Sequence, residues 1–190
     1  RPGQITLIHS GVLYPQERDP RPFFSALQAL KKNSEINSGT LRVVLRATGS
    51  DDMYRQMLDY YGISDLVELA PSIGYRAALQ EMLCADGLLL FQAAMCNHQI
   101  PAKLYEYFRA GRPILALTDP VGNTAETLRR AGAMDIVNIA DELDIADGLR
   151  RFLAGLQGST LQGVWTEVAE LNSRRSRTAE LAHLLDGVIS

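Results

Sequence analysis

Residues 87–117, GLLLFQAAMCNHQIPAKLYEYFRAGRPILAL, contain two short apolar runs separated by a polar loop and a helical pattern. The runs at 87–91 and 113–117 are almost continuously apolar, which is typical of strands covered on both faces of a parallel sheet. Pro101 suits the first position of a helix, and Gly111 suits its end. A strand, a crossover helix and a second strand in this order predict an α/β fold.

The same alternation continues on both sides of this segment. Four more apolar runs predict strands, at 5–8, 41–45, 66–69 and 134–139. Further helical patterns lie at 23–30, 53–61, 72–85, 123–132, 141–156 and 160–186. Ser72 is expected to cap the helix that ends near residue 85, and Asn123 and Glu126 have the spacing of a capping box.

These elements predict one domain over residues 1–190, with a core at about 4–157 and a C-terminal helix at about 160–186. The predicted architecture is a single doubly wound, Rossmann-like parallel sheet of six strands with helices on both faces. Ligands of such sheets bind beyond the carboxyl ends of the strands, where the winding direction reverses. For the common strand order 3-2-1-4-5-6, the loops at this crevice are 10–21 and 92–100.

Composition excludes several classes of protein. The chain is 46% hydrophobic and 22% charged, and its 19 basic against 22 acidic residues argue against a nucleic-acid-binding arm. No apolar run approaches the length of a membrane span, and the start lacks the layout of a signal peptide. Two cysteines cannot form a disulfide framework, so we expect a reducing, cytoplasmic location. The start at Arg1 is expected to be a boundary cut from a longer protein.

The loop at 92–100 leads into a helix start that lacks its own cap. With Pro101 at the first helical position, Ile100 would be the N-cap, and isoleucine cannot cap. The amides of the next three residues then need another acceptor, and a phosphate would satisfy them. Lys103 adds a positive charge, and Glu106, one turn further on, can accept hydrogen bonds from ligand hydroxyls. The alternative is that water satisfies the amides and that Lys103 and Glu106 form a surface ion pair.

The loop at 10–21 carries a glycine and two arginines. Gly11 would let the backbone approach a ligand closely, and Arg18 and Arg21 could each bind a phosphate with a planar fork. The alternative is a surface loop in which the arginines pair with Glu17 and Asp19.

The segment 99–117 resembles the donor-site segment of retaining, group 1 glycosyltransferases of the GT-B fold. The residues that carry this resemblance are Pro101, Lys103 and Glu106, followed by Gly111-Arg112-Pro113 and the buried strand. Residues 11–21 resemble, more loosely, the glycine-rich loop and basic residue of the same C-terminal domain, and the resemblance extends over about 4–186.

This resemblance implies the donor-binding, C-terminal half of a bacterial-type enzyme that takes a sugar from a nucleotide-diphosphate sugar. Glu106 would hold the ribose hydroxyls, and the helix start at Pro101, Ala102 and Lys103 would lie near the phosphates. Arg18, with Lys103, would stabilise the diphosphate leaving group as negative charge develops on it. These two are therefore the expected catalytic residues.

The remaining expected donor contacts are Gly11, His98, Asn123 and Thr124. The last two follow the fifth strand, within reach of the same crevice. His98 stands where many members of the family have a second glutamate, Val12 where they often have an arginine, and Glu17 where they often have a lysine.

The resemblance also implies that the acceptor-binding N-terminal domain is missing. We therefore expect the chain to bind the donor without transferring its sugar. No cofactor and no metal are expected, since Cys96 and His98 lack a second Cys–His pair and the nucleotide sugar is the substrate. The base, sugar, acceptor, stereochemical outcome and oligomeric state are left open.

Three other functions compete with this one. They are a catalytically inactive nucleotide-binding or regulatory module of the same fold, half of a sugar-nucleotide epimerase, and a doubly wound interaction domain without a ligand. In the last predicted helix, Arg174, Arg175 and Arg177 form a basic cluster. It is either a solvated face or a contact with the missing domain or with the inner face of a membrane.

Overall fold

The computed structural model describes residues 3–133, 135–161, 170–171 and 173–189. Its strands form one sheet in the order β3-β2-β1-β4-β5-β6, and every neighbouring pair is parallel. The strands are β1 (Ile5–Ser10), β2 (Leu41–Arg46), β3 (Val67–Ala70), β4 (Gly87–Gln92), β5 (Ile114–Thr118) and β6 (Ile136–Val137). The predicted doubly wound fold is confirmed, and the winding reverses between β1 and β4 as expected.

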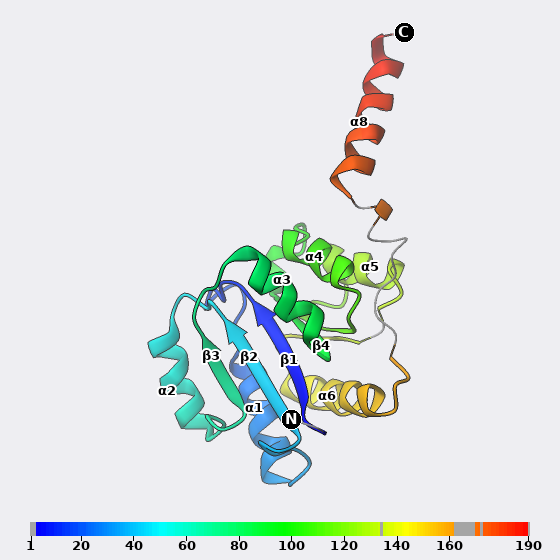
Figure 1. Cartoon of the computed structure of the whole chain (residues 1–190). Helices are drawn as coiled ribbons and strands as arrows, with labels where there is room; N and C mark the ends of the chain where they lie inside the picture. The colour runs from blue at the N-terminus through cyan, green and yellow to red at the C-terminus, as the bar shows by residue number, and fades with distance from the viewer. Residues whose placement is uncertain (1–2, 134, 162–169, 172, 190) are drawn as a thin grey trace.

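Helices cover both faces of the sheet (Figure 1). One face is covered by α1 (Arg21–Lys32), α2 (Asp51–Tyr61) and α6 (Glu142–Gln157). The other is covered by α3 (Tyr75–Cys84), α4 (Ala102–Ala110) and α5 (Asn123–Arg130), and a short 3-10 turn, η1 (Ala94–Cys96), follows β4. A last helix, α8 (Arg174–Ile189), leads away from these layers (Figure 1).

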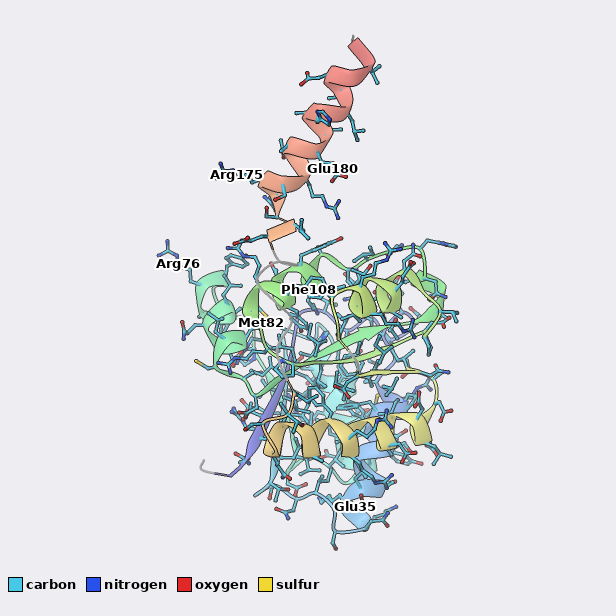
Figure 2. The ribbon with its side chains drawn as sticks, turned by 90° about the vertical axis from the view of Figure 1, so that its right-hand side faces the viewer. Glu35, Arg76, Met82, Phe108, Arg175 and Glu180 are labelled. Carbon is cyan, nitrogen blue, oxygen red and sulfur yellow. The ribbon has the colours of Figure 1, made fainter. Side chains whose placement is uncertain are left out.

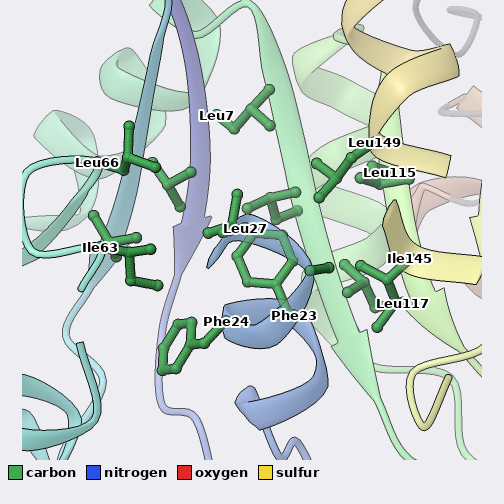
Figure 3. Close-up of a cluster of buried hydrophobic side chains, with 14 of the residues drawn as sticks. Leu7, Phe23, Phe24, Leu27, Ile63, Leu66, Leu115, Leu117, Ile145 and Leu149 are labelled. Atoms are coloured by element: carbon green, nitrogen blue, oxygen red, sulfur yellow. The ribbon is translucent and has the colours of Figure 1, made fainter. Parts of the chain in front are cut away.

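Two apolar cores result from the period-two alternation of the strands. In the first, Phe23 and Leu27 of α1 pack with Leu7, Leu115 and Leu149 (Figure 3). Full burial of one such leucine or phenylalanine stabilises the fold by about 1.5–3 kcal/mol.

The second core lies under α3, α4 and α5. Met82 of α3 and Phe108 of α4 are buried in it (Figure 2). Because both cores hold their helices firmly against the sheet, the loops at the carboxyl edge start and end on fixed elements.

The side chains of α8 are largely exposed. Arg175 and Glu180 project into solvent (Figure 2), and Arg177 pairs with Glu180 at 2.9 Å. Exposed apolar residues recur along this helix at helical spacing, at Leu181, Leu184, Leu185 and Val188. Among the described helices, none is long and apolar enough to cross a membrane.

Three predicted N-caps are wrong by one or two residues. Helix α3 begins at Tyr75 behind Gly74, not behind Ser72, and α4 begins at Ala102 with Pro101, not Ile100, as its N-cap. Pro101 has an extended ψ of 131°, so it stands outside the helix. Asn123 is the first residue of α5, behind Gly122 as N-cap, and its side chain caps nothing. Its backbone amide donates to the Asn97 carbonyl at 3.0 Å.

The C-terminal part also differs from the prediction. Strand β6 is shorter than 134–139, and Met134 lies outside the described residues. Thr160 and Leu161 are not helical, and α8 begins at Arg174 and runs past residue 186. Residues 162–169 and 172 of the helix expected at 160–186 lie outside the described part of the chain.

Candidate functional site

The strands β1 and β4 separate at the carboxyl edge of the sheet. Their ladder contains only the pairs Leu7–Gly87 and Ile8–Leu88, so the next carbonyl, that of Leu89, is not paired with β1. Two side chains contact this carbonyl instead. It accepts a hydrogen bond from the Tyr107 hydroxyl at 3.2 Å and lies 3.0 Å from Nδ1 of His9. The two strands therefore diverge at the position of the predicted crevice, and polar side chains lie between them there.

The loop after β1 is held to its surroundings by backbone hydrogen bonds. Gly11 donates to the Arg46 carbonyl at 2.8 Å, and Leu13 donates to the Thr48 carbonyl at 3.1 Å. Further along, the amide of Ala93 donates to the Glu17 carbonyl at 2.8 Å. The two loops that were predicted to form the crevice, 10–21 and 92–100, are therefore joined directly.

Lys103 points inward from the first turn of α4. Its Nζ lies 3.0 Å from Nε2 of His9, and a β-carbon at Gly11 would lie 3.1 Å from the same Nζ. Lys103 forms no ion pair with Glu106 among the described residues, so the alternative of a surface ion pair is wrong. Burial, and next the charge of Arg18, lower the pKa of Lys103 to about 7, although Glu106 opposes this.

His9 belongs to this cluster, and the sequence analysis missed it. It is 1% exposed, and its ring packs edge-on against Phe91 with the centroids 5.1 Å apart. Burial, with the nearby charges of Lys103 and Arg18, lowers its pKa well below the usual range. The available signal was a polar residue near the end of an apolar strand, two positions before Gly11.

The two arginines of the first loop have different surroundings. Arg18 donates from Nη1 to the Val12 carbonyl at 2.7 Å, lies over the Tyr14 ring, and forms no ion pair within the described residues. Arg21 is bound to Asp19 at 2.6 Å, as the alternative interpretation of this loop expected. Of these two arginines, only Arg18 keeps a charge that no carboxylate of the described chain neutralises.

Glu106 lies one turn beyond Lys103 and remains partly exposed. The Tyr75 hydroxyl donates to its Oε1 at 3.4 Å, and no cation of the described residues pairs with it. Its carboxylate oxygens thus remain able to accept hydrogen bonds from a ligand.

At the start of α4, one of the three amides expected to need an acceptor is satisfied, because Leu104 donates to the Pro101 carbonyl at 2.8 Å. The amides of Ala102 and Lys103 have no acceptor in the described part of the chain. Ala102 is exposed at this end of α4.

The loops after β4 and β5 are linked to each other. The Thr124 hydroxyl donates to the Gln99 carbonyl at 3.0 Å, and Asn97 donates to the Asp119 carboxylate at 2.7 Å. Thr124 is buried, whereas His98 and Asn123 are exposed at this edge. Thr124 thus stabilises the loop, and the donor contacts expected of His98, Asn123 and Thr124 stay predictions. The described residues contain no group of three or more His, Cys, Asp or Glu side chains that could hold a metal ion.

No protein-family model matches the sequence, and no curated protein matches it significantly. Solved structures do match its fold. The α,α-trehalose-6-phosphate synthase from Burkholderia multivorans aligns with a TM-score of 0.67 at 17% identity, over 98% of this chain and 44% of that one. Sucrose-phosphate synthase from Thermosynechococcus elongatus aligns with a TM-score of 0.64 at 12% identity, over 97% of this chain and 46% of that one.

A UDP-forming α,α-trehalose-phosphate synthase from Burkholderia xenovorans gives the same result, with a TM-score of 0.64, 18% identity, and coverage of 95% of this chain and 44% of that one. At these identities the likeness concerns the fold, and this chain spans less than half of each of the three structures. The chain therefore has the fold of one domain of the GT-B type, which is consistent with the C-terminal domain that residues 99–117 resemble.

Proposed function

We propose that this chain is the donor-binding domain of a glycosyltransferase that transfers a sugar from a nucleotide-diphosphate sugar. The observation that carries the proposal is the convergence of Arg18, Lys103 and the start of α4 where β1 and β4 separate. This position is the ligand crevice of doubly wound sheets.

The diphosphate is the part of the donor that this arrangement suits best. Neither Arg18 nor Lys103 has a carboxylate partner among the described ion pairs, and the amides of Ala102 and Lys103 are free to donate within the described part of the chain. Phosphate oxygens would accept from these groups, and the positive end of α4 favours their charge. During sugar transfer the same cations would stabilise the negative charge that develops on the leaving diphosphate.

Glu106 suits the ribose of the donor. A carboxylate accepts hydrogen bonds from two neighbouring hydroxyls, and Glu106 lies three residues along α4 from Lys103, on roughly the same side of the helix. His98 and Asn123, both exposed at the same edge, would contact the sugar or the phosphates.

The acceptor would be bound by a domain outside this chain, because the chain covers only 44% to 46% of the three matching enzymes. We therefore expect donor binding without sugar transfer by this chain alone. The exposed apolar residues of α8, spaced at three and four positions, offer a surface on which the second domain can pack.

Thermal unfolding in the presence of UDP, GDP, ADP or CMP tests the proposal. At one hundred times Kd a ligand stabilises the chain by about 2.7 kcal/mol, which is a melting shift of roughly 5–10 °C for a domain of this size. We expect a shift with one nucleoside diphosphate, and its loss in Glu106→Gln but not in the control Glu68→Gln, whose carboxylate lies on β3 and pairs with Arg42. A shift with none of the four, or with CMP alone, would contradict a diphosphate donor.

A catalytically inactive nucleotide-binding module is the second candidate. Val12 stands in the first loop where the family often has an arginine, and His98 stands where it often has a glutamate. Such a module would bind a nucleoside diphosphate without distinguishing its sugar conjugates. Comparing the affinities of several sugar conjugates of the selected nucleotide separates the two candidates, because a donor domain should prefer one sugar.

A further inference from the structure

The buried imidazole of His9 has no role in the donor site as proposed, yet it contacts Lys103, which is proposed to bind the diphosphate. His9 lies on β1 where this strand leaves β4, between the Leu89 carbonyl and the Nζ of Lys103. A carbonyl can only accept a hydrogen bond, so Nδ1 of His9 carries the proton and Nε2 presents its lone pair to Lys103.

Burial, and next the positive charge of Lys103, keep this imidazole neutral. Toward Lys103 lie His9 from β1, the Gly11 backbone and Arg18 from the following loop, and Glu106 from α4 itself. Tyr107, also on α4, donates its hydroxyl to the same Leu89 carbonyl. Two cations thus share a partly buried space with one carboxylate, and a third positive charge on His9 would add repulsion.

Two uncharged groups fix the position of Nζ, and neither neutralises the charge of Lys103. The His9 Nε2 accepts from it at 3.0 Å, and Gly11, which has no side chain, leaves room for it. A carboxylate in place of the imidazole would neutralise Lys103, whereas the neutral ring holds the ammonium and leaves its charge for a ligand.

We propose that His9 is a positioning residue for donor binding, which holds Nζ of Lys103 beside the Gly11 backbone, where it would meet the diphosphate of the donor. This inference rests on the proposed function. It assigns to His9 no contact with the donor, since its ring is buried behind the lysine.

The pKa of Lys103 in the ligand-free chain sets the direction in which the affinity for the donor changes with pH. Burial and Arg18 lower the pKa of Lys103 to about 7, and the two negative phosphates of a bound donor would raise it again. Above pH 7 the free site is partly deprotonated and the complex is protonated, so binding takes up a proton. Over that range Kd rises with pH, by up to about tenfold per pH unit.

Titration calorimetry of the whole chain measures this uptake. The probe is UDP-glucose, GDP-glucose or ADP-glucose, according to the base selected by the unfolding screen, because these phosphodiesters do not titrate near neutral pH. At about pH 8, in two buffers of different ionisation enthalpy, the wild type should take up close to one proton per ligand. Lys103→Arg, whose charge is permanent, should bind without proton uptake.

A matched pair of variants separates positioning from packing. In His9→Gln the amide oxygen can occupy the place of Nε2 and accept from Lys103, whereas in His9→Asn the shorter amide can reach only the Leu89 carbonyl. We expect His9→Gln to stay within about threefold of the wild-type Kd and to keep the proton uptake. His9→Asn should bind about tenfold more weakly, with reduced uptake, at a melting temperature similar to that of His9→Gln.

The outcomes are distinguishable. If the wild type binds none of the nucleotide sugars, the proposed function fails, and this inference fails with it. If the wild type binds but His9→Gln and His9→Asn bind equally well or equally weakly, only the role of His9 is overturned.

Discussion

A β-carbon at Gly11 would lie 3.1 Å from the Nζ of Lys103, although Gly11 lies in the loop after β1 and Lys103 lies in α4. Gly11 also has a φ of +117°, a backbone conformation that residues with a side chain rarely adopt. The cluster of His9, Arg18 and Lys103 thus depends on the missing side chain of Gly11 as much as on the charged side chains that are present.

Gly11→Ala should therefore weaken both the fold and the site. We expect a loss of about 1–3 kcal/mol in the free energy of unfolding from backbone strain, together with weaker nucleotide binding because Nζ is displaced. The control is Gly62→Ala: Gly62 also has a positive φ, of +64°, but a β-carbon there meets nothing within 4 Å. Thermal unfolding with and without nucleotide measures both effects, and equal binding by the two variants would contradict the close approach of Lys103 to Gly11.

Arg18→Ala should lower the affinity for the nucleoside diphosphate by about 10–100-fold, the range expected for a lost charge-assisted hydrogen bond. Arg21→Ala should change this affinity by less than about twofold, because its guanidinium is already bound to Asp19 and is largely exposed. Calorimetric titration of both variants provides the comparison. A larger loss of affinity in Arg21→Ala than in Arg18→Ala would show that the phosphates bind Arg21, which contradicts the proposal.

Lys103→Met should raise the free energy of unfolding of the ligand-free chain below pH 7. Folding lowers the pKa of Lys103 from 10.5 to about 7, so between these values the unfolded chain binds a proton that the folded chain does not. Wild-type stability should therefore rise with pH across this interval, while the variant lacks this contribution. By this linkage, replacing the buried ammonium should add on the order of 4 kcal/mol below pH 7, and the gain should shrink toward pH 10.

Urea unfolding of both proteins at several pH values measures this difference. The exposed Lys32, at the end of α1, provides the control variant Lys32→Met, which should show no such pH-dependent gain. A gain for Lys103→Met that stays constant from pH 6 to pH 10 would contradict the lowered pKa.

Arg46→Ala should destabilise the fold strongly, because its removal leaves a partner charge without compensation. Arg46 is buried at the end of β2, pairs with the Glu81 carboxylate and donates to the Pro71 carbonyl at 2.6 Å. We expect a loss of about 3 kcal/mol. Arg42→Ala, on the same strand but with its Glu68 pair half-exposed, should cost less than about 1 kcal/mol. Equal losses in chemical denaturation would show that burial does not distinguish the two pairs.

Much of the fold followed from local patterns in the sequence. The apolar runs predicted five of the strands at nearly their observed positions, and the strand order placed the crevice between the loops at 10–21 and 92–100. The helix starts were less predictable. At the start of α5 the first amide donates to the Asn97 carbonyl from another loop, and no local pattern reports such a contact.

The sequence by itself determined the α/β class, the doubly wound arrangement and the basic, proline-started segment that forms the candidate site, because apolar period and helix signals act over a few neighbouring residues. Only the tertiary structure decided that Lys103 turns inward to His9, 94 positions away, and that Arg21 is neutralised while Arg18 is not. These choices depend on where β1 and β4 separate, and burial there decides which charges keep partners. Side chains distant in the chain meet at that point, so their contacts and pKa values belong to the folded state alone.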